Sequence, residues 1–361
     1  MIKFIYFLCL CISHNFGANI DYYQIVNKAN RAIYLNDFDE AKKQLDLGFS
    51  INSNPYHYDV YKWILCNSKS GNKQENTKWL NFLVLEKKIP PKLLKHKLAN
   101  FLTTEDVRFL DAMPYEAPKS KIKTLLLDMI KKDQAIRDFS SCGNIYDENQ
   151  NSDKNCLKKL FARRDSLDEV HAKEFVSLME KYGIPSENDL GVYLKGDVNS
   201  NYNQLFYILG IHFAQTGYRA KIVDIYKKAH DEYKFHPELY GSFYEFIQSQ
   251  NLDFGKRLLH SPVSKVDGRY YKPFIVYTDS TLDSINENRL KIGLDSVQIN
   301  REQVLSDILC PTKRGEIKII SFPSIVEVPY WLVKGAFEKE NRDLDNYLID
   351  LKTIKSACEK E

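Results

Sequence analysis

The sequence predicts a mainly α-helical protein, with helical hairpins first and then a helical domain that carries a small β-hairpin or sheet near the C-terminus. Apolar residues recur at helical spacing through most of the chain. Gly and Pro residues punctuate these periodic segments, and β-rich runs begin near Gly268. With 43% hydrophobic residues, a chain of 361 residues can form the cores of two domains of ordinary size.

The N-terminus has the form of a secretory signal peptide. Lys3 supplies an early positive charge, and an unbroken apolar run follows from Phe4 to Ile12. Small residues at Gly17 and Ala18 offer a cleavage point, so we predict a signal over residues 1–18. The run is shorter than the ~20 residues that span a bilayer, so we expect no stable membrane span. These features predict an exported protein, periplasmic or extracellular, with a buried N-terminal helix or a lipid anchor as alternatives.

Residues 19–112 are predicted to be helical and tetratricopeptide-like. Small residues let paired helices approach each other, and large residues fill the groove between them. Six positions follow this spacing: Ile25, Ala29, Ala32, Ala41, Leu45 and Gly48. Plain helical packing without a repeat is the alternative. Residues 113–120, with two prolines and no periodicity, are predicted to be a linker.

A second helical domain is predicted over residues 121–300. Its periodic segments are residues 122–137, 156–182, 202–215, 219–233 and 237–250. Residues 301–361 are predicted to form a β-containing extension that ends in a charged helix from Glu338. The β-rich runs are residues 269–277, 316–322 and 325–331.

Cys142 and Cys156 bracket a segment rich in Ser, Asn and Asp that has few apolar residues to order it. We predict a disulfide between them, because closing a loop of about 15 residues contributes about 3 kcal/mol in the chain-entropy model. Two unrelated thiols are the alternative. No CxxC motif occurs, which excludes a zinc ribbon and a thioredoxin-type motif.

The composition and the motifs exclude several function classes. Charged residues make up 27% of the chain and nearly cancel, with a formal charge of +3, so no nucleic acid is expected as a partner. Phosphate loops, dinucleotide fingerprints, nucleophile elbows and HExxH motifs are absent from the sequence. We therefore predict no cofactor, and no bound metal, because no repeated carboxylate-x-x-His pair occurs.

Polar residues occupy apolar helix faces, and they are the candidate site. Asp133 and Arg137 lie one turn apart on the first helix of the second domain, and His212 lies on the apolar face of the third. On the second helix, Arg164, Asp168 and His171 follow at steps of about one turn. Charged groups on a core-facing stripe are costly unless they are paired, so a meeting of these groups in one interior is expected.

Three interpretations of this cluster remain open. A buried salt-bridge network that holds the helices in register is the first. A pocket in which arginines bind an anionic group is the second. The third is an acid–base or metal-assisted hydrolase, in which Asp168 and His171 act as a pair.

Four short signatures resemble the uncharacterised bacterial family known as DUF6624. They are Asp133-Gln134-x-x-Arg137, the turn Tyr182–Pro185, a helix that ends near His212, and Asn288-Arg289-x-x-x-Gly293-Leu294. The resemblance covers about half of the chain, from Lys121 to Val297. The family usually has Trp where Ile184 stands, so this chain would be a divergent member. The resemblance implies a domain and no reaction, and it adds Arg289 to the candidate residues.

We therefore expect an exported binding or scaffold module with a polar pocket, whose partner is an unknown small ligand or a protein. The predicted pocket residues are Asp133, Arg137, Asp168, His171, His212 and Arg289. Arg137 and Arg289 are expected to recognise an anionic or carbohydrate-like ligand. An exported hydrolase that uses the Asp/His constellation is the alternative.

Overall fold

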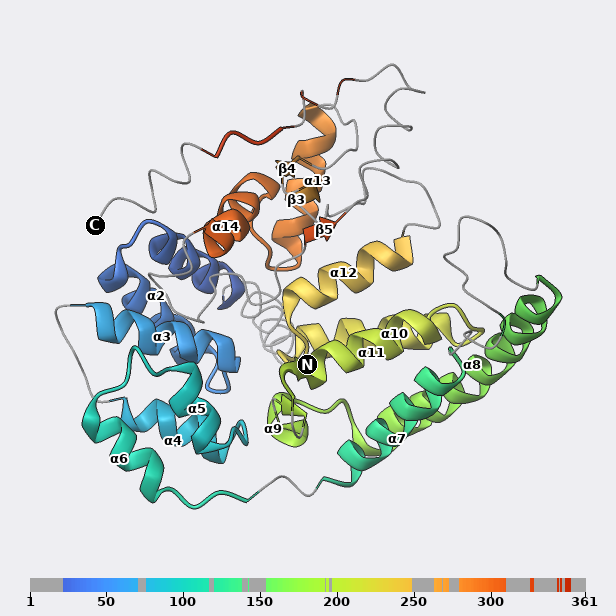
Figure 1. Cartoon of the computed structure of the whole chain (residues 1–361), viewed down its shortest axis with the longest axis horizontal. Coiled ribbons are helices and arrows are strands. Elements are labelled where there is room, and N and C mark those ends of the chain that lie inside the picture. The colour runs from blue at the N-terminus through green and yellow to red at the C-terminus, as the bar shows by residue number, and fades with distance from the viewer. Residues whose placement is uncertain are drawn as a thin grey trace, which may run out of the picture. The chain divides into compact units, whose positions relative to one another are not determined.

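The computed structural model divides the chain into two compact units. It describes residues 22–70, 76–116, 120–137, 142, 154–191, 193–194, 197–248, 263–267, 269–272, 279–309, 325–327, 343, 345 and 348–351. Unit 1 comprises Met1–Val84, Pro90–Pro114 and Tyr244–Glu361, and unit 2 comprises Leu85–Ile89 and Tyr115–Phe243. The fold is mainly helical with a small sheet near the C-terminus, as predicted (Figure 1).

Unit 1 begins with a helical hairpin, formed by a helix over residues 22–34 and by α2 (Phe38–Ile51). The turn between them depends on Asn36, which adopts φ 61° and thereby reverses the chain. Asp37 then caps α2, because its side chain accepts a hydrogen bond from the backbone N–H of Glu40 at 3.1 Å. The helical hairpin predicted for this segment is therefore present.

The six positions of the predicted hairpin pattern are all buried, which confirms the helical packing. Gly48 is the closest approach: a Cβ at this position would lie 3.5 Å from the Ile25 side chain and 3.6 Å from Tyr22. An alanine would therefore make ordinary van der Waals contacts here, whereas a much bulkier side chain would require the two helices to move apart. The small-residue spacing acts as the sequence analysis expected.

A buried ion pair lies within α3 (His57–Lys69) and contacts this hairpin through Tyr22. The Lys62 ammonium lies 3.2 Å from the Asp59 carboxylate, and the Tyr22 hydroxyl donates to the same carboxylate at 2.8 Å. Asp59 and Lys62 are 1% and 2% exposed. Each charge therefore has a direct partner inside the core, which offsets part of the cost of desolvation.

Three shorter helices follow in unit 1: α4 (Thr77–Leu85), α5 (Pro91–Lys97) and α6 (Thr104–Ala112). Pro91 occupies the first turn of α5, where a missing N–H costs nothing. Thr103 and Asp106 form a capping box at the start of α6. Asp106 also accepts a hydrogen bond from the Asn76 amide at 2.8 Å, which joins α6 to the start of α4.

The C-terminal part of unit 1 contains a sheet in the order β4-β3-β5 and two helices, α13 (Asp279–Lys291) and α14 (Val297–Leu309). β3 (Val263–Val266) pairs antiparallel with β4 (Arg269–Tyr271) and parallel with β5 (Ile325–Glu327). β4 and β5 lie within the predicted β-rich runs 269–277 and 325–331. α13 lies within the predicted helical domain 121–300 but in none of its predicted periodic segments, and most of α14 lies beyond that domain.

The N-terminal helix of unit 1 contacts the turn between α13 and α14. Gly293 adopts φ 76°, and its Cα faces the Tyr23 ring so closely that a Cβ would overlap the ring. Asn27 donates a side-chain hydrogen bond to the Gly293 carbonyl at 3.0 Å. The helix over residues 22–34 and the α13–α14 turn therefore pack in one unit, a contact that no local pattern indicates.

The predicted C-terminal helix is wrong where the structure describes it. Leu348 forms an antiparallel bridge with Tyr271, and the Ile349 N–H donates to the Tyr270 carbonyl at 3.0 Å. The free edge of β4 offers backbone partners to an extended segment, and this pairing outweighs the helical charge pattern. The predicted strand at residues 316–322 and the predicted signal at residues 1–18 lie outside the described residues.

Unit 2 is built around two long helices, α7 (Lys121–Ala135) and α8 (Lys154–Tyr182), which lie side by side (Figure 1). α9 (Glu187–Leu190) and the strands β1 (Tyr193–Leu194) and β2 (Asp197–Asn201) follow. α10 (Tyr202–Phe213) and α11 (Arg219–Asp231) pack on α8, and α12 (Pro237–Gln248) begins in this unit.

Aromatic rings form the core that joins α8, α10, α11 and α12. The Tyr226 ring is central to it: its centroid lies 4.6 Å from that of Phe206 and 4.3 Å from that of Phe243. Phe175 of α8 packs against Phe206 and Phe213 of α10, with both centroid distances 5.6 Å. Aromatic contacts of this kind add to the free energy gained from burial alone.

The buried face of α8 differs from the apolar stripe that helical spacing predicts within residues 156–182. The positions of that stripe are Leu157, Leu160, Leu167, Phe175, Leu178 and Tyr182. Of those six, Phe175 is buried, whereas Tyr182 is exposed and the four leucines are half-buried. The buried positions are Asp168, His171, Ala172, Phe175, Val176 and Met179. Periodicity alone predicted that the leucines would be buried. Packing of α8 against the aromatic core instead buries the face that includes Asp168 and His171.

The two units cut the chain near the predicted linker but divide its C-terminal half differently from the predicted domains. One boundary falls at Pro114/Tyr115, next to the predicted linker at residues 113–120. The other falls at Phe243/Tyr244, so the end of the predicted 121–300 domain belongs to the same unit as the N-terminal hairpin. Contacts such as that between Asn27 and Gly293 explain this grouping.

Candidate functional site

α7 carries Asp133 into the interior of unit 2. Ser120 caps the helix by accepting a hydrogen bond from the Lys123 N–H at 3.4 Å. Ile122, Leu126 and Met129 are the other buried positions of α7, and steps of three and four residues place them on one face with Asp133. The Asp133 side chain is 0% exposed, so its carboxylate depends entirely on protein partners for hydrogen bonds.

Arg137 joins the carboxylates of two helices. Its Nη1 lies 2.7 Å from Asp133 Oδ1 and donates to the Asp133 carbonyl at 2.9 Å. Its Nη2 donates to both oxygens of Asp168 on α8, at 2.9 and 2.8 Å. A single guanidinium therefore connects the end of α7 to the buried face of α8, in the manner expected of charge-assisted pairs.

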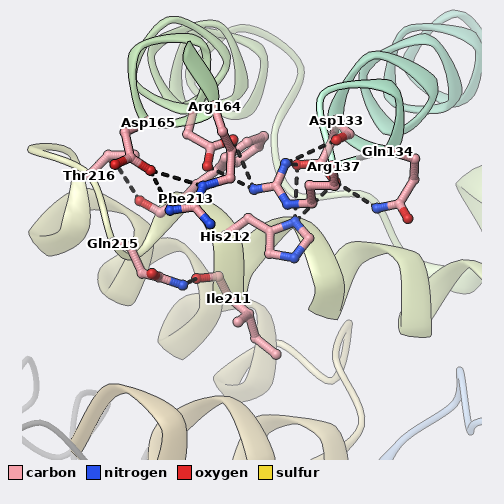
Figure 2. A network of polar contacts seen from close by, with 11 residues as sticks. Asp133, Gln134, Arg137, Arg164, Asp165, Ile211, His212, Phe213, Gln215 and Thr216 are labelled. Carbon is pink, nitrogen blue, oxygen red and sulfur yellow. Dashed lines mark hydrogen bonds and ion pairs between the residues drawn. The ribbon is translucent and has the colours of Figure 1, made fainter. Parts of the chain in front are cut away.

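His212, near the end of α10, completes the network (Figure 2). Its Nδ1 lies 3.0 Å from each oxygen of Asp133, and Gln134 donates to Asp133 Oδ2 at 2.8 Å. The His212 side chain is 22% exposed and that of Arg137 is 16% exposed. We call Asp133, Arg137, Asp168 and His212 the polar network; it joins three helices, and two of its side chains are partly exposed.

The charges of the polar network nearly balance. Two carboxylates and one guanidinium leave one negative charge when the imidazole is neutral, and a proton on His212 would cancel it. Burial raises the pKa of the Asp168 carboxyl above its ordinary value, and the hydrogen bonds and charge of Arg137 offset that rise only in part. The network is therefore sensitive to any loss of the Arg137 charge.

His171 and Arg164 do not join the polar network through any hydrogen bond or ion pair among the described residues. His171 is buried one turn after Asp168, and its Nδ1 has no hydrogen-bond partner in the described part of the chain. Arg164 contacts the adjacent Asp165 and lies 5.0 Å from the Phe161 ring. The expected pairing of Asp168 with His171 is replaced by the contact of Asp168 with Arg137.

Arg289 belongs to unit 1, whereas the other five predicted residues belong to unit 2. It is buried, and its Nε donates to the carbonyl of Asp295. The Asp295 carboxylate accepts a hydrogen bond from Gln303 at 3.3 Å. Burial raises the pKa of Asp295 to about 6, against the lowering effects of Gln303 and Arg289. The hypothesis that Arg137 and Arg289 bind one ligand stays a prediction.

The two cysteines of the predicted disulfide come together in unit 2. The structure joins the sulfur atoms of Cys142 and Cys156, whose Cα atoms lie 5.5 Å apart. This separation is within the usual range for a disulfide. The bridge therefore joins Cys142 to the first turn of α8, which contains Cys156.

A groove of about 500 Å³ lies between α7 and α8, separate from the polar network. Leu125, Met129 and Leu178 line it, together with lysines from both helices. Sequence reasoning missed this groove because it concentrated on buried faces. The signal that could have revealed it was the alternation of lysines and leucines on the outer face of α7. Among the described residues, no group of three or more His, Cys, Asp or Glu side chains is placed to hold a metal ion.

Comparison with known proteins adds no relative to this description. No family model matches the chain, and no match was found among curated proteins or among solved structures. The resemblance to the DUF6624 family therefore stays a prediction.

Proposed function

We propose that this protein is an exported helical binding module that presents the His212 ring to a small ligand. The observation that carries the proposal is the difference in solvent exposure between two hydrogen-bonded residues, Asp133 and His212. Asp133 is 0% exposed and lies against Nδ1 of an imidazole that is itself 22% exposed. If Nδ1 carries the proton and donates it to this carboxylate, Nε2 is left as the hydrogen-bond acceptor of this partly exposed ring.

The chemistry of the His212 ring suggests the class of ligand. A neutral Nε2 accepts a hydrogen bond from a hydroxyl group, and a protonated ring attracts an anion. Nη1 and Nη2 of Arg137 already donate to carboxylates of the chain itself, so the arginine positions the site. We infer a hydroxyl-bearing or carbohydrate-like small ligand, with His212 as its polar contact.

A hydrolase is the second candidate, and the same pair of residues favours it. A buried carboxylate that orients an imidazole through Nδ1 prepares Nε2 to remove a proton from water. In that case His212 would be the general base and Asp133 the residue that orients it. The two candidates share one site and differ in whether the bound molecule is cleaved.

Export rests on other features. The signal-like pattern at residues 1–18 supports it, and the joined sulfurs of Cys142 and Cys156 suit an oxidising compartment. Among the helices that the structure describes, none is both long and apolar enough to cross a bilayer.

The deciding variant is His212→Asn. The Asn amide can still donate to Asp133 in place of Nδ1, but it has no atom at the position of Nε2. We expect a loss of stability of about 1 kcal/mol or less together with loss of binding. Proton–nitrogen correlation spectra of the histidine rings should show a proton on Nδ1 of His212. Titration with glucose, N-acetylglucosamine and galacturonate should then move the His212 Nε2 resonance.

His96→Asn, at an exposed position in unit 1, is the matched control and should change neither property. Release of nitrophenol from nitrophenyl acetate and nitrophenyl glycosides distinguishes the hydrolase from the binding module. If no sugar and no nitrophenyl substrate responds to His212→Asn, the network only braces the three helices.

A further inference from the structure

The groove between α7 and α8 has an apolar floor that is open to solvent. Leu125 of α7 and Leu178 of α8 line the groove and are half-buried, and Met129, which also lines it, is buried. Tyr182 lies at one end and is 39% exposed. On α7 the lining residues extend from Lys121 to Lys132, which corresponds to about 16 Å along a helix axis.

The rim of the groove carries more positive than negative charge. Four lysines and two carboxylates line it, which leaves a net charge of +2. Lys132 is engaged by Asp128 at 2.9 Å, so the excess positive charge lies with Lys121, Lys173 and Lys181. Lys121 is also the first residue of α7, where the helix dipole adds positive potential.

An apolar floor with a cationic rim requires a ligand that is itself apolar and anionic. A neutral apolar molecule would leave the lysines without compensation, and a small inorganic anion would leave the leucines exposed. A volume of about 500 Å³ lies within the range of small-molecule sites. We propose that this groove binds a free single-chain anionic amphiphile, with the acyl chain along the leucines and the carboxylate among the lysines.

The site is independent of the proposed function, because none of its lining residues belongs to the polar network. Either site can therefore fail without the other. Lys173 and Lys181 are exposed and belong to α8, so their replacement removes charge from the rim without opening the core.

Dodecanoate below its micellar concentration is the probe, and titration calorimetry of the full chain measures its binding. Dodecyltrimethylammonium is the control ligand of opposite charge. We expect the protein to prefer dodecanoate, and we expect Lys173→Glu with Lys181→Glu to weaken dodecanoate binding at least about tenfold. The same variant should bind the cationic amphiphile more tightly. Leu178→Gln should weaken both ligands, because it removes part of the apolar floor.

Lys158→Glu with Lys159→Glu is the matched control variant, because it makes the same change of charge on exposed residues of the same helix outside the groove. It should leave dodecanoate affinity within about twofold, because salt screens charges beyond roughly 8–10 Å. Circular dichroism confirms that each variant is folded. The proposal is overturned if both lysine pairs have equal effects, or if the cationic amphiphile binds as well as dodecanoate. It is also overturned if binding occurs only to phosphatidylglycerol vesicles, since a bilayer surface would then be the partner.

Discussion

Two buried ion clusters in this protein use the same chemistry and differ in access to solvent. In unit 1, Asp59 contacts Lys62 and Tyr22, and the two charged residues are at most 2% exposed. In unit 2, Asp133 contacts Arg137 and His212, whose side chains are 16% and 22% exposed. The first cluster is closed, whereas the second combines a fully buried carboxylate with partners that reach the surface.

If the proposed function holds, the difference in exposure separates a cluster with a purely structural role from one that binds a ligand. A closed ion pair contributes specificity of packing and offers no atom to a ligand. An open cluster has the same cost of burial at Asp133, yet it presents a positioned imidazole to the solvent. Such an arrangement is expected where a polar group must be held ready, because positioned groups do not have to be reorganised when a ligand binds.

The largest effect should come from breaking the closed pair. Lys62→Met keeps most of the side-chain volume and leaves the Asp59 carboxylate buried without its cation. We expect a loss of about 4 kcal/mol in the free energy of unfolding. Urea unfolding followed by the fluorescence of Trp63 and Trp79, which both lie in unit 1, measures it. The double variant Asp59→Asn with Lys62→Met should recover part of this loss; no recovery would contradict an ionic origin.

Breaking the open cluster should cost somewhat less and depend on pH. Arg137→Met leaves Asp133 and Asp168 facing each other, and we expect a loss of about 3 kcal/mol at pH 8. Because burial already raises the pKa of Asp168, the folded variant takes up a proton as the pH falls, and the loss should shrink near pH 5. Hydrogen exchange of α7 and α8 amides is the measurement. Arg163→Met, on the exposed face of α8, is the control, and an equal, pH-independent loss there would refute the explanation.

The unit that contains the open cluster also contains the Cys142–Cys156 disulfide, whereas the closed cluster lies in the other unit. Replacing Cys142 and Cys156 with serine should destabilise unit 2 by about 2 to 3 kcal/mol, because the unfolded loop regains its entropy. Hydrogen exchange should increase in α7 and α8 of the variant. Unit 1, followed by the fluorescence of Trp63 and Trp79, should unfold at the same urea concentration as in the wild-type protein. Peptide mapping without reductant should recover the linked pair from the wild-type protein. Alkylation of both thiols in the native protein would contradict the bridge.

Replacing Asp295, a buried carboxyl in unit 1, should give the smallest change in the free energy of unfolding. It adds to the comparison a buried carboxyl that lies outside both ion clusters. Its pKa is raised from 3.8 to about 6 by burial, so folding takes up a proton between these values, and stability falls as the pH rises from about 4 to about 6. Asp295→Asn removes this penalty. We expect a gain of about 2 kcal/mol above pH 7 and almost none at pH 4. Urea unfolding across this pH range tests it, and a gain that does not vary with pH would exclude the carboxyl as its source.

Part of the candidate site could be predicted from helical periodicity. Asp133 occupies a buried position of α7, His212 of α10 contacts it directly, and Asp168 of α8 joins it through Arg137. Helical periodicity placed all three polar residues on apolar faces. Periodicity could not identify which groups would bond. His171 lies one turn from Asp168, yet the longer side chain of Arg137 reaches the Asp168 carboxylate.

The sequence by itself determined the local features: the mainly helical fold, the hairpin with its Asn36 turn, and the cysteine pair that brackets the insertion. These follow from interactions between neighbours along the chain, which spacing and residue type report. Tertiary structure alone decided that Gly293 packs against Tyr23, that Leu348 forms a β-bridge with Tyr271, and that the buried face of α8 includes Asp168 and His171. Each of these features depends on contact with a segment distant in sequence. The free energy gained from that contact exceeds the local secondary-structure preference of the residues involved.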